Sequence, residues 1–277
     1  MDNENNFELI IEPGKRLKHY WKEIWLYREL FFFLTWRDIL IRYKQTAIGI
    51  AWAVIRPLMT MVVFTVVFGK IASLPSDGIP YPVLVLTASL PWQLFSNSLS
   101  ESSNSLISNA AMIGKVYFPR IALPVSNIGA SLFDFIISLA ILIVMMIFYQ
   151  VIPSWKVLMI PVFTVIALAA SLGGGLWISA LNVKYRDFRY IVPFIVQFGL
   201  FISPVGFSSN VVPDQWRLMY SMNPMVGVID GFRWAIAGNS VRFHFEGFIV
   251  SLIIVIALLV SGFWYFRKTE RTFADII

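Results

Sequence analysis

The chain has 277 residues, of which 58% are hydrophobic, 16% aromatic and only 14% charged. A water-soluble domain of this size has to expose much more polar surface, so the composition and the mean hydropathy of +0.72 exclude that class and indicate a membrane protein. In a soluble protein the net charge of +6 would suggest a nucleic-acid partner. In a membrane protein the distribution of lysine and arginine along the chain is the better guide, and we expect no nucleic-acid partner. Cysteine is absent, which excludes disulfides and thiolate chemistry.

Six apolar stretches are each close to the ~20 residues that a helix needs to cross a bilayer. The second is the weakest, because polar residues enter it from Ser96 onward. We expect an all-α membrane protein with a cytoplasmic segment 1–47, a membrane domain 48–266 and a cytoplasmic tail 267–277. The expected spans are residues 48–68, 81–99, 125–149, 157–181, 190–207 and 247–266.

The distribution of basic residues predicts the orientation of these spans. With both termini in the cytoplasm, 16 Lys/Arg fall on the cytoplasmic side and five in the outer loops, while Arg56 lies within the first span. This imbalance follows the positive-inside rule. The first apolar run begins near Ile48 and follows a charged, aromatic-rich segment instead of a short basic one, so we expect no cleavable signal peptide.

The segment from Pro13 to Gln45 has apolar and aromatic residues at helical spacing, with charged residues on its other faces. This pattern predicts an amphipathic helix on the cytoplasmic lipid surface, with Trp and Tyr at headgroup depth. The alternative is a soluble helix packed on another cytoplasmic element.

Residues 100–120, between the second and third spans, are expected to form a cytoplasmic loop. A Ser/Asn-rich beginning gives way to Val116, Tyr117 and Phe118, flanked by cations. Apolar side chains on the cytoplasmic side are costly to leave in water, so the segment is expected to dock into a partner. Alternatively, the aromatic residues anchor the third span at the interface.

Residues 208–246, on the outer side, contain apolar runs too short to span and interrupted by proline and glycine. Such runs are typical of re-entrant helices, which must be buried in protein or line a wet cavity. We expect them to line an outward-facing vestibule, with a plain folded outer loop as the alternative.

The residues that carry most enzyme chemistry are sparse. His19 and His244 fall on opposite sides of the predicted membrane, which argues against a shared metal site or catalytic pair. No Gly-x-x-x-x-Gly-Lys-Ser/Thr motif occurs, so the sequence contains no phosphate-binding loop of the usual kind. Arg56 and Asp134 are the main ionisable residues within spans, and each marks either a pathway or a buried pair.

Aromatic residues form a ladder on one face of the fifth span, and the first span has a looser version. Rings in a passage can stack against the C–H faces of sugars, whereas packed or lipid-facing rings are the alternative. The ladder consists of Phe194, Gln197, Phe198 and Phe201, and the first span adds Trp52 and Phe64.

Short motifs follow one another in a fixed order over nearly the whole chain. They include Trp36-Arg37-Asp38-Ile39, Arg42-Tyr43-Lys44-Gln45-Thr46, Lys115-Val116-Tyr117-Phe118-Pro119-Arg120, Asn182-Val183-Lys184-Tyr185-Arg186-Asp187, Ser203-Pro204-Val205 and Gly231-Phe232-Arg233. In this order and spacing the chain resembles the permease subunits of type-2 ABC exporters for bacterial surface polysaccharides. The pattern looks closest to the O-antigen and capsule exporters.

The resemblance implies a homodimer in the bacterial inner membrane, associated with two copies of a separate cytoplasmic ATPase. ATP and Mg would be bound by that partner, and this chain would hold no cofactor and no metal and would not itself be an enzyme. The implied substrate is a polysaccharide linked to undecaprenyl diphosphate.

The resemblance also implies four groups of functional residues, each retaining its number in this sequence. The polysaccharide channel would use Trp52, Phe64, Phe194, Gln197, Phe198 and Phe201. The lipid diphosphate would contact Arg37, Arg42, Lys44 and Arg56. Coupling to the ATPase would use Lys115, Val116, Tyr117, Phe118 and Arg120. An outer gate would use Phe207, Pro213, Trp216, Phe232 and Arg233.

Three other functions remain as alternatives at the level of sequence. One is an ABC exporter permease for teichoic acid or a smaller lipid-linked substrate. Another is a membrane enzyme acting on polyprenyl phosphates, which would need clustered acidic or histidine residues that the sequence does not offer. A secondary transporter would ordinarily have two related halves, and no internal repeat is evident.

Overall fold

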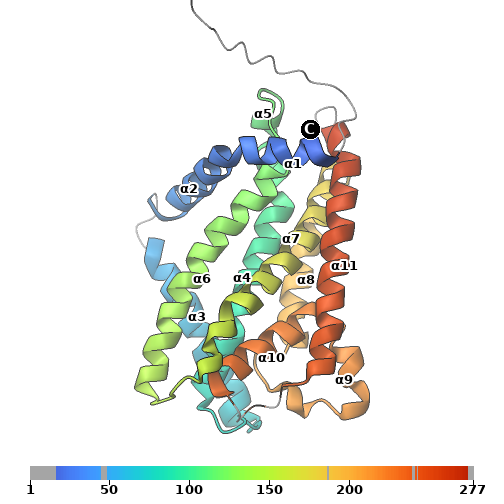
Figure 1. The fold of residues 1–277 in the computed structure, drawn as a ribbon. Coiled ribbons are helices and arrows are strands. Elements are labelled where there is room, and N and C mark those ends of the chain that lie inside the picture. The colour runs from blue at the N-terminus through green and yellow to red at the C-terminus, as the bar shows by residue number, and fades with distance from the viewer. Residues whose placement is uncertain (1–16, 45–48, 186, 239–240, 242, 274–277) are drawn as a thin grey trace, which may run out of the picture.

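The structure is a computed structural model that describes residues 17–44, 49–185, 187–238, 241 and 243–273. Every regular element in these residues is helical, and the elements form one bundle (Figure 1). The described chain begins with α1 (Leu17–Leu26) beside the end of α11 (Phe245–Thr269), where Tyr20 and Phe263 pack edge to face. We call this the terminal end of the bundle and the opposite one the distal end.

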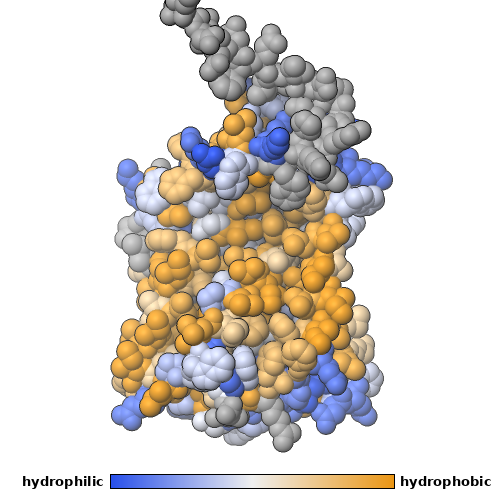
Figure 2. Space-filling view, viewed as in Figure 1, coloured by the Kyte–Doolittle hydropathy of each residue, from blue (hydrophilic) through white to orange (hydrophobic). Residues whose placement is uncertain are grey.

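Four helical segments are long and apolar enough to cross a membrane: Ala51–Ile71, Ala122–Phe148, Trp155–Lys184 and Phe245–Thr272. They correspond to the first, third, fourth and sixth predicted spans. On the face that Figure 2 shows, apolar side chains cover the middle of the bundle and hydrophilic residues gather at both ends. The helices that make up these segments are α3 (Gly49–Phe64) with the π-helical turn Thr65–Ile71, α6 (Ala122–Phe148), α7 (Ile160–Lys184) preceded by the 3-10 turn Trp155–Met159, and α11 followed by Glu270–Thr272.

The second and fifth predicted spans correspond to helices of a different kind. α4 (Tyr81–Ser108) has 28 residues but is rich in serine and lies in the centre of the bundle. α8 (Phe188–Ile202) is apolar but has only 15 residues, so it measures about 22 Å at 1.5 Å per residue. It ends five residues before the predicted boundary at Phe207, and a buried turn with Pro204 follows it. Length and composition therefore identify four segments as candidate membrane spans. That α4 and α8 also cross the membrane stays a prediction.

The expectation of a loop from Ser100 onward is wrong, because α4 continues through Ser108 and is followed by α5 (Ala110–Ile113). The serines do not break the helix, since their hydroxyls bond to carbonyls of the preceding turn. Ser103 Oγ lies 2.5 Å from the Leu99 carbonyl oxygen. Ser102 Oγ instead donates to the Pro124 carbonyl of α6 at 2.9 Å. Polar residues thus extend α4 toward the terminal end and attach it to its neighbours.

The N-terminal segment forms two helices, α1 and α2 (Arg28–Lys44), rather than one, with a break at Tyr27. The predicted ends at Pro13 and Gln45 lie outside the described residues. α2 packs on α6 through buried Leu34 and through Thr35, whose hydroxyl donates to the Ser126 carbonyl at 3.0 Å. Its opposite side exposes aromatic residues, which is the surface an interfacial helix needs. The largest of these are Trp25 of α1 and Phe32, Phe33 and Trp36 of α2.

The region at the distal end contains α9 (Asp214–Tyr220) and α10 (Pro224–Ala237). The Asn223 side chain caps α10 by accepting from the Met225 amide at 3.0 Å. α10 is buried along most of its length and packs against α4, α7 and α11. A Cβ atom at Gly231 would lie 2.3 Å from the Phe163 ring, so glycine is what permits this close packing.

The triple glycine of α7 is a helix crossing point. A Cβ on Gly173 would lie 2.7 Å from the backbone of α11 at Leu258 and Leu259, and one on Gly175 would lie 2.7 Å from Ser102 of α4. Small residues allow such close helix approach in membrane bundles. The run therefore fixes α7 against two neighbours at once.

Candidate functional site

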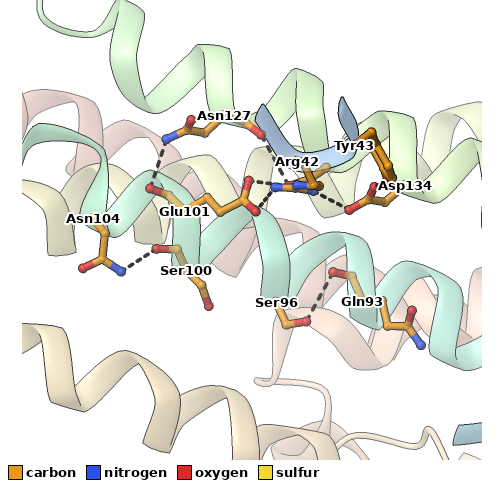
Figure 3. Close-up of polar contacts among 10 residues, drawn as sticks. Arg42, Tyr43, Gln93, Ser96, Ser100, Glu101, Asn104, Asn127 and Asp134 are labelled. Carbon is orange, nitrogen blue, oxygen red and sulfur yellow. Dashed lines mark hydrogen bonds and ion pairs between the residues drawn. The ribbon is translucent and has the colours of Figure 1, made fainter. Parts of the chain in front are cut away.

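A polar cluster joins three helices near the terminal end of the bundle. Arg42 is the third-last residue of α2, and its guanidinium lies between Glu101 of α4 and Asp134 of α6, forming ion pairs with both (Figure 3). The Tyr43 hydroxyl also donates to Asp134. The carboxylate of Glu101 accepts a further hydrogen bond from Ser131 at 3.3 Å. One turn of α2 is thereby fixed to both α4 and α6.

The electrostatics of the cluster favour its charged, hydrogen-bonded form. Burial opposes the charge on Arg42, but the carboxylates of Glu101 and Asp134 outweigh it and raise the pKa of the guanidinium. Burial, and then the bond to Asp134, raise the pKa of the Tyr43 hydroxyl, so Tyr43 remains a donor. Arg42 already has two carboxylate partners, which leaves it poorly placed to bind a diphosphate unless it gives one of them up.

A cavity of about 410 Å³ adjoins this cluster and opens between α2, α3, α4 and α6. Trp52 and Arg56 of α3 form one side of it, and Gln93 and Asn97 of α4 form another. The structure thus brings the predicted residues Trp52, Arg42 and Arg56 to one cavity. Trp52 is a predicted channel residue, whereas Arg42 and Arg56 are predicted diphosphate contacts.

The other predicted diphosphate contacts lie apart from this cavity. The Arg37 guanidinium is bound by the adjacent Asp38 at 2.8 Å and by Asn109 at 3.2 Å, and it lines a second cavity of about 550 Å³. Lys44 is exposed at the end of α2. Arg42 lines both cavities, Arg37 and Arg56 line one each, and Lys44 is not among the lining residues of either. The four predicted cations therefore do not meet at one cavity, and their role as a group remains a prediction.

The aromatic ladder lies on an open face of α8. Phe194, Phe198 and Phe201 are each more than half exposed, and Gln197 beside them is exposed as well. The rings of Phe194 and Phe198 have their centroids 4.2 Å apart. Such a face needs a partner surface, a lipid or a substrate to cover it.

Phe64 differs from the other predicted channel residues, because it is buried. Its ring packs edge to face on Phe68 and lies 6.5 Å from the ring of Phe201. Both Phe64 and Phe68 also approach Gly206, where a Cβ would collide with the Phe68 ring. Phe64 therefore packs next to the ladder residue Phe201 and exposes little surface to a substrate.

The predicted coupling residues divide into an exposed tip and a buried base. Lys115, Val116 and Tyr117 are exposed beyond α5, at the terminal end of the bundle. Phe118 is buried in an apolar cluster with Phe266 and Phe273. Of the predicted coupling residues, the tip is therefore the part that is exposed at the surface.

Arg120, the last predicted coupling residue, is directed into the protein. Its backbone N–H donates to the Glu270 carboxylate at 3.0 Å, and its guanidinium donates to the Glu270 carbonyl. The other carboxylate oxygen accepts from the Tyr20 hydroxyl at 3.4 Å. Burial first, and then Glu270, raise the pKa of Tyr20, which keeps that hydroxyl protonated. The base of the coupling segment is thus joined to both α1 and the end of α11.

The predicted outer gate also divides into buried and exposed residues. Arg233 of α10 is only 1% exposed and donates to the carbonyls of Phe207 at 2.8 Å and Val205 at 3.3 Å. Phe232 is buried between the rings of Phe135 and Phe163. These two residues hold the turn after α8 and the core in place.

The remaining gate residues lie near the surface. Pro213 and Trp216 are exposed at the start of α9, and Phe207 is half-buried in the turn. Near α9, the carboxylate of Asp77 accepts from the Ser208 hydroxyl and, at 3.2 Å, from the Asn210 amide. A gating role for all five residues stays a prediction. Among the described residues there is no group of three or more metal-ligating His, Cys, Asp or Glu side chains.

The profile of the ABC-2 type transporter family matches residues 29–237, which is most of the chain and contains every element described so far from α3 to α10. The chain belongs to this family. It is a multi-pass membrane protein of the ABC-2 type, matching the predicted resemblance to type-2 ABC exporter permeases.

Similar proteins of known name cover almost the whole of this ABC-2 chain. The O-antigen export system permease protein RfbA of Myxococcus xanthus is 28% identical over 92% of this chain and 98% of its own length. A protein of the same name from Klebsiella pneumoniae is 27% identical over 90% of this chain and 95% of its own length. The polysialic acid transport protein KpsM of Escherichia coli is 24% identical over 85% of this chain and 91% of its own length.

Sequence reasoning missed several residues that organise these sites in the ABC-2 chain. Asp134 is unusual within an apolar span, but its partners Arg42 and Tyr43 come from a helix 92 and 91 residues earlier. The polar residues around Glu101 predict a loop there and give no sign of its ion pair with Arg42. The contacts of Glu270 with Arg120 and Tyr20 could not be predicted, because a single carboxylate in a C-terminal tail belongs to no motif or periodic pattern.

Proposed function

We propose that this chain is the permease subunit of a bacterial ABC exporter that moves an O-antigen-like polysaccharide, linked to undecaprenyl diphosphate, across the plasma membrane. The observation that carries the proposal is near full-length similarity to permeases named for O-antigen export. The similarity to a polysialic acid transport protein supports polysaccharide as the substrate class. The linkage to a polyprenyl diphosphate is an inference from the predicted resemblance.

Two such subunits form the translocation path in this proposal, with both termini in the cytoplasm and six helices crossing the membrane. The exposed ladder of Phe194, Phe198 and Phe201 supports a dimeric path, because one protomer alone leaves it uncovered. A sugar hydroxyl that enters hydrocarbon without a hydrogen-bond partner costs several kcal/mol, so a long glycan needs a protein-lined passage. Rings on one face provide weak contacts along which sugars can slide.

The energy comes from a separate ATPase that binds ATP and Mg. The sequence supports this division, because no phosphate-binding loop occurs in it. The exposed tip at Lys115, Val116 and Tyr117 offers that partner an apolar surface next to a cation. Movement of the tip would reach α1 and α11 through the bonds of Arg120 to Glu270.

Reconstitution of both subunits in liposomes tests the proposal. Lipid-linked polysaccharide added to one side should become inaccessible to a glycan-degrading enzyme only when ATP and both subunits are present. A catalytically inactive ATPase is the control for passive flipping. Transport by this chain without the ATPase, or nucleotide hydrolysis by this chain alone, would overturn the proposed division of labour.

A further inference from the structure

The cavity beside the Arg42 cluster has the size of a ligand site. Its volume of about 410 Å³ lies within the range of roughly 300–1,000 Å³ that is usual for small-molecule pockets. It lies on the α2 and α6 side of α3, and none of the exposed ladder residues of α8 lines it.

The charges around the cavity are balanced. The formal charges of Arg42 and Arg56 equal those of Glu101 and Asp134, and Arg42 is already paired with both carboxylates. An anion placed here would gain from Arg56 but would meet two carboxylates close by. The cavity is therefore better matched to an uncharged polar ligand than to a diphosphate.

Unused hydrogen-bonding groups line the side of the cavity formed by α4. Gln93, Asn97 and Glu101 recur at intervals of four residues, which places them on one face of the helix. The side-chain amides of Gln93 and Asn97 make no hydrogen bond to the described residues. Each amide offers both donors and an acceptor, as neighbouring hydroxyls on one ring require.

An aromatic residue of α3 lines the same cavity as these amides. Trp52 is 50% exposed and belongs to the lining. A flat apolar ring in a cavity that also offers donors and acceptors suits a ligand with one C–H face and an edge of hydroxyls.

We propose that this cavity is a carbohydrate subsite that holds an uncharged sugar residue of the substrate between α2, α3, α4 and α6. Trp52 stacks on the sugar face, while Gln93 and Asn97 bond to its hydroxyls. This proposal rests on the proposed function of polysaccharide export. It assigns Trp52 to a site separate from the α8 ladder and assigns Arg42 a positioning role instead of a phosphate contact.

The test measures binding of a defined probe to the complex of both subunits in lipid nanodiscs. The probe is the lipid-free polysaccharide, released by mild acid from the precursor of the same bacterium and labelled at its reducing end. Gln93→Leu and Asn97→Leu should each weaken binding about tenfold, since each leaves sugar hydroxyls unpaired. Trp52→Leu should weaken binding similarly, and Trp52→Phe should restore part of it. Unchanged binding in all three loss variants would overturn the proposal.

Matched controls separate the subsite from general damage. Trp155 is exposed at the distal end, so Trp155→Leu should bind the probe as the wild type does. If a leucine variant fails to fold, the isosteric Asn97→Asp retains the shape and loses the amide donor, and it should still bind about tenfold more weakly. Normal binding by a folded Asn97→Asp variant, with both leucine variants unfolded, would count against the subsite.

Competition distinguishes a sugar from an anionic headgroup. Phosphatidylglycerol in the nanodisc should leave probe affinity unchanged. If it displaced the probe, and only Arg56→Gln removed that competition, the cavity would be a phosphate site and the proposal would fail. ATP-driven transport is measured in parallel. Transport with unaltered probe binding in the variants overturns the subsite alone, whereas absence of transport by the wild-type complex overturns the proposed function.

Discussion

The backbone N–H of Arg120 donates to the carboxylate of Glu270 at 3.0 Å, across 150 residues of sequence. This bond joins the segment that carries the exposed tip to the end of the last helix. The same carboxylate accepts from Tyr20 of α1, and the Arg267 guanidinium lies 4.0 Å from the centre of the Tyr20 ring. Glu270 therefore connects three elements at the terminal end through which force from an ATPase would have to pass.

Removal of the Glu270 side chain should reduce the coupling between ATP hydrolysis and export. Glu270→Ala abolishes two hydrogen bonds of about 1 kcal/mol each, so we expect the ratio of polysaccharide exported to ATP hydrolysed to fall roughly tenfold. The measurement is simultaneous transport and phosphate release in proteoliposomes. Thr272→Ala, in the same turn but exposed, is the control. An unchanged ratio in Glu270→Ala would show that the connection is only structural.

Charge reversal should act differently at the tip and at its base. Lys115→Glu changes an exposed residue, so the permease should fold normally but bind and stimulate the ATPase poorly. Arg120→Glu places a second carboxylate beside Glu270, so it should lower the thermal stability of the permease itself. Thermal unfolding of the isolated permease and pull-down of the ATPase distinguish the two effects. Lys22→Glu, an exposed reversal on α1, is the control, and an identical phenotype at positions 115 and 120 would contradict the division into tip and base.

The sequence predicted the class of fold because apolar length and charge asymmetry are local signals. The four apolar segments begin and end within a few residues of the predicted spans, apart from the extension of the last one to Thr272. The boundary of α4 could not be predicted in the same way. A run of serines predicts a loop, because the sequence does not show which carbonyl oxygens accept hydrogen bonds from their hydroxyls. These acceptors lie on α6 and in the preceding turn of α4.

The functional roles predicted for Arg42, Lys115 and Arg233 stay predictions. The contacts that Arg42 and Arg233 make in the fold involve residues distant in sequence. Whether a basic residue contacts substrate or completes an ion pair depends on carboxylates such as Asp134 and Glu101, which only tertiary packing brings to it. Single-sequence periodicity has no means of encoding such a pairing.

The Arg42 cluster should be a major source of stability for the junction of α2 with the bundle. Arg42→Met leaves Glu101 and Asp134 without their counter-charge, so we expect a loss of about 1–3 kcal/mol in unfolding free energy. Asp134→Asn should cost less, because Glu101 still pairs with Arg42. In denaturant unfolding, the loss of stability in the Arg42→Met/Asp134→Asn double variant should differ clearly from the sum of the two single losses. Arg28→Met, on the exposed surface of α2, is the control and should have little effect. Additive effects within the cluster would show that its members act independently.

Two adjacent glycines of α7 should respond oppositely to the same added methyl group. At Gly173 the new Cβ would meet the α11 backbone at 2.7 Å, which cannot yield without moving a helix. At Gly174 it would meet only the end of the Leu99 side chain at 3.0 Å, which can rotate. Gly173→Ala should therefore destabilise the permease by about 1–3 kcal/mol despite the gain in helix propensity, and Gly174→Ala should be neutral or stabilising. Thermal unfolding in detergent compares them, and equal melting temperatures would rule out a tight α7–α11 crossing.

The exposed rings of α8 should matter for transport and little for folding. Phe198 and Phe201 are more than half exposed in this chain, so their truncation creates no core cavity and the unfolding free energy should change by less than about 1 kcal/mol. If the rings line a glycan path, Phe198→Ala with Phe201→Ala should lower ATP-driven export by roughly tenfold while ATPase binding stays normal, because two weak stacking contacts are lost together. Phe148→Ala, a similarly exposed ring on α6, provides the matched control. Export that falls equally in the control would point to a general effect of aromatic surface at the lipid boundary, whereas unaffected export in the double variant would leave the ladder with a purely structural role.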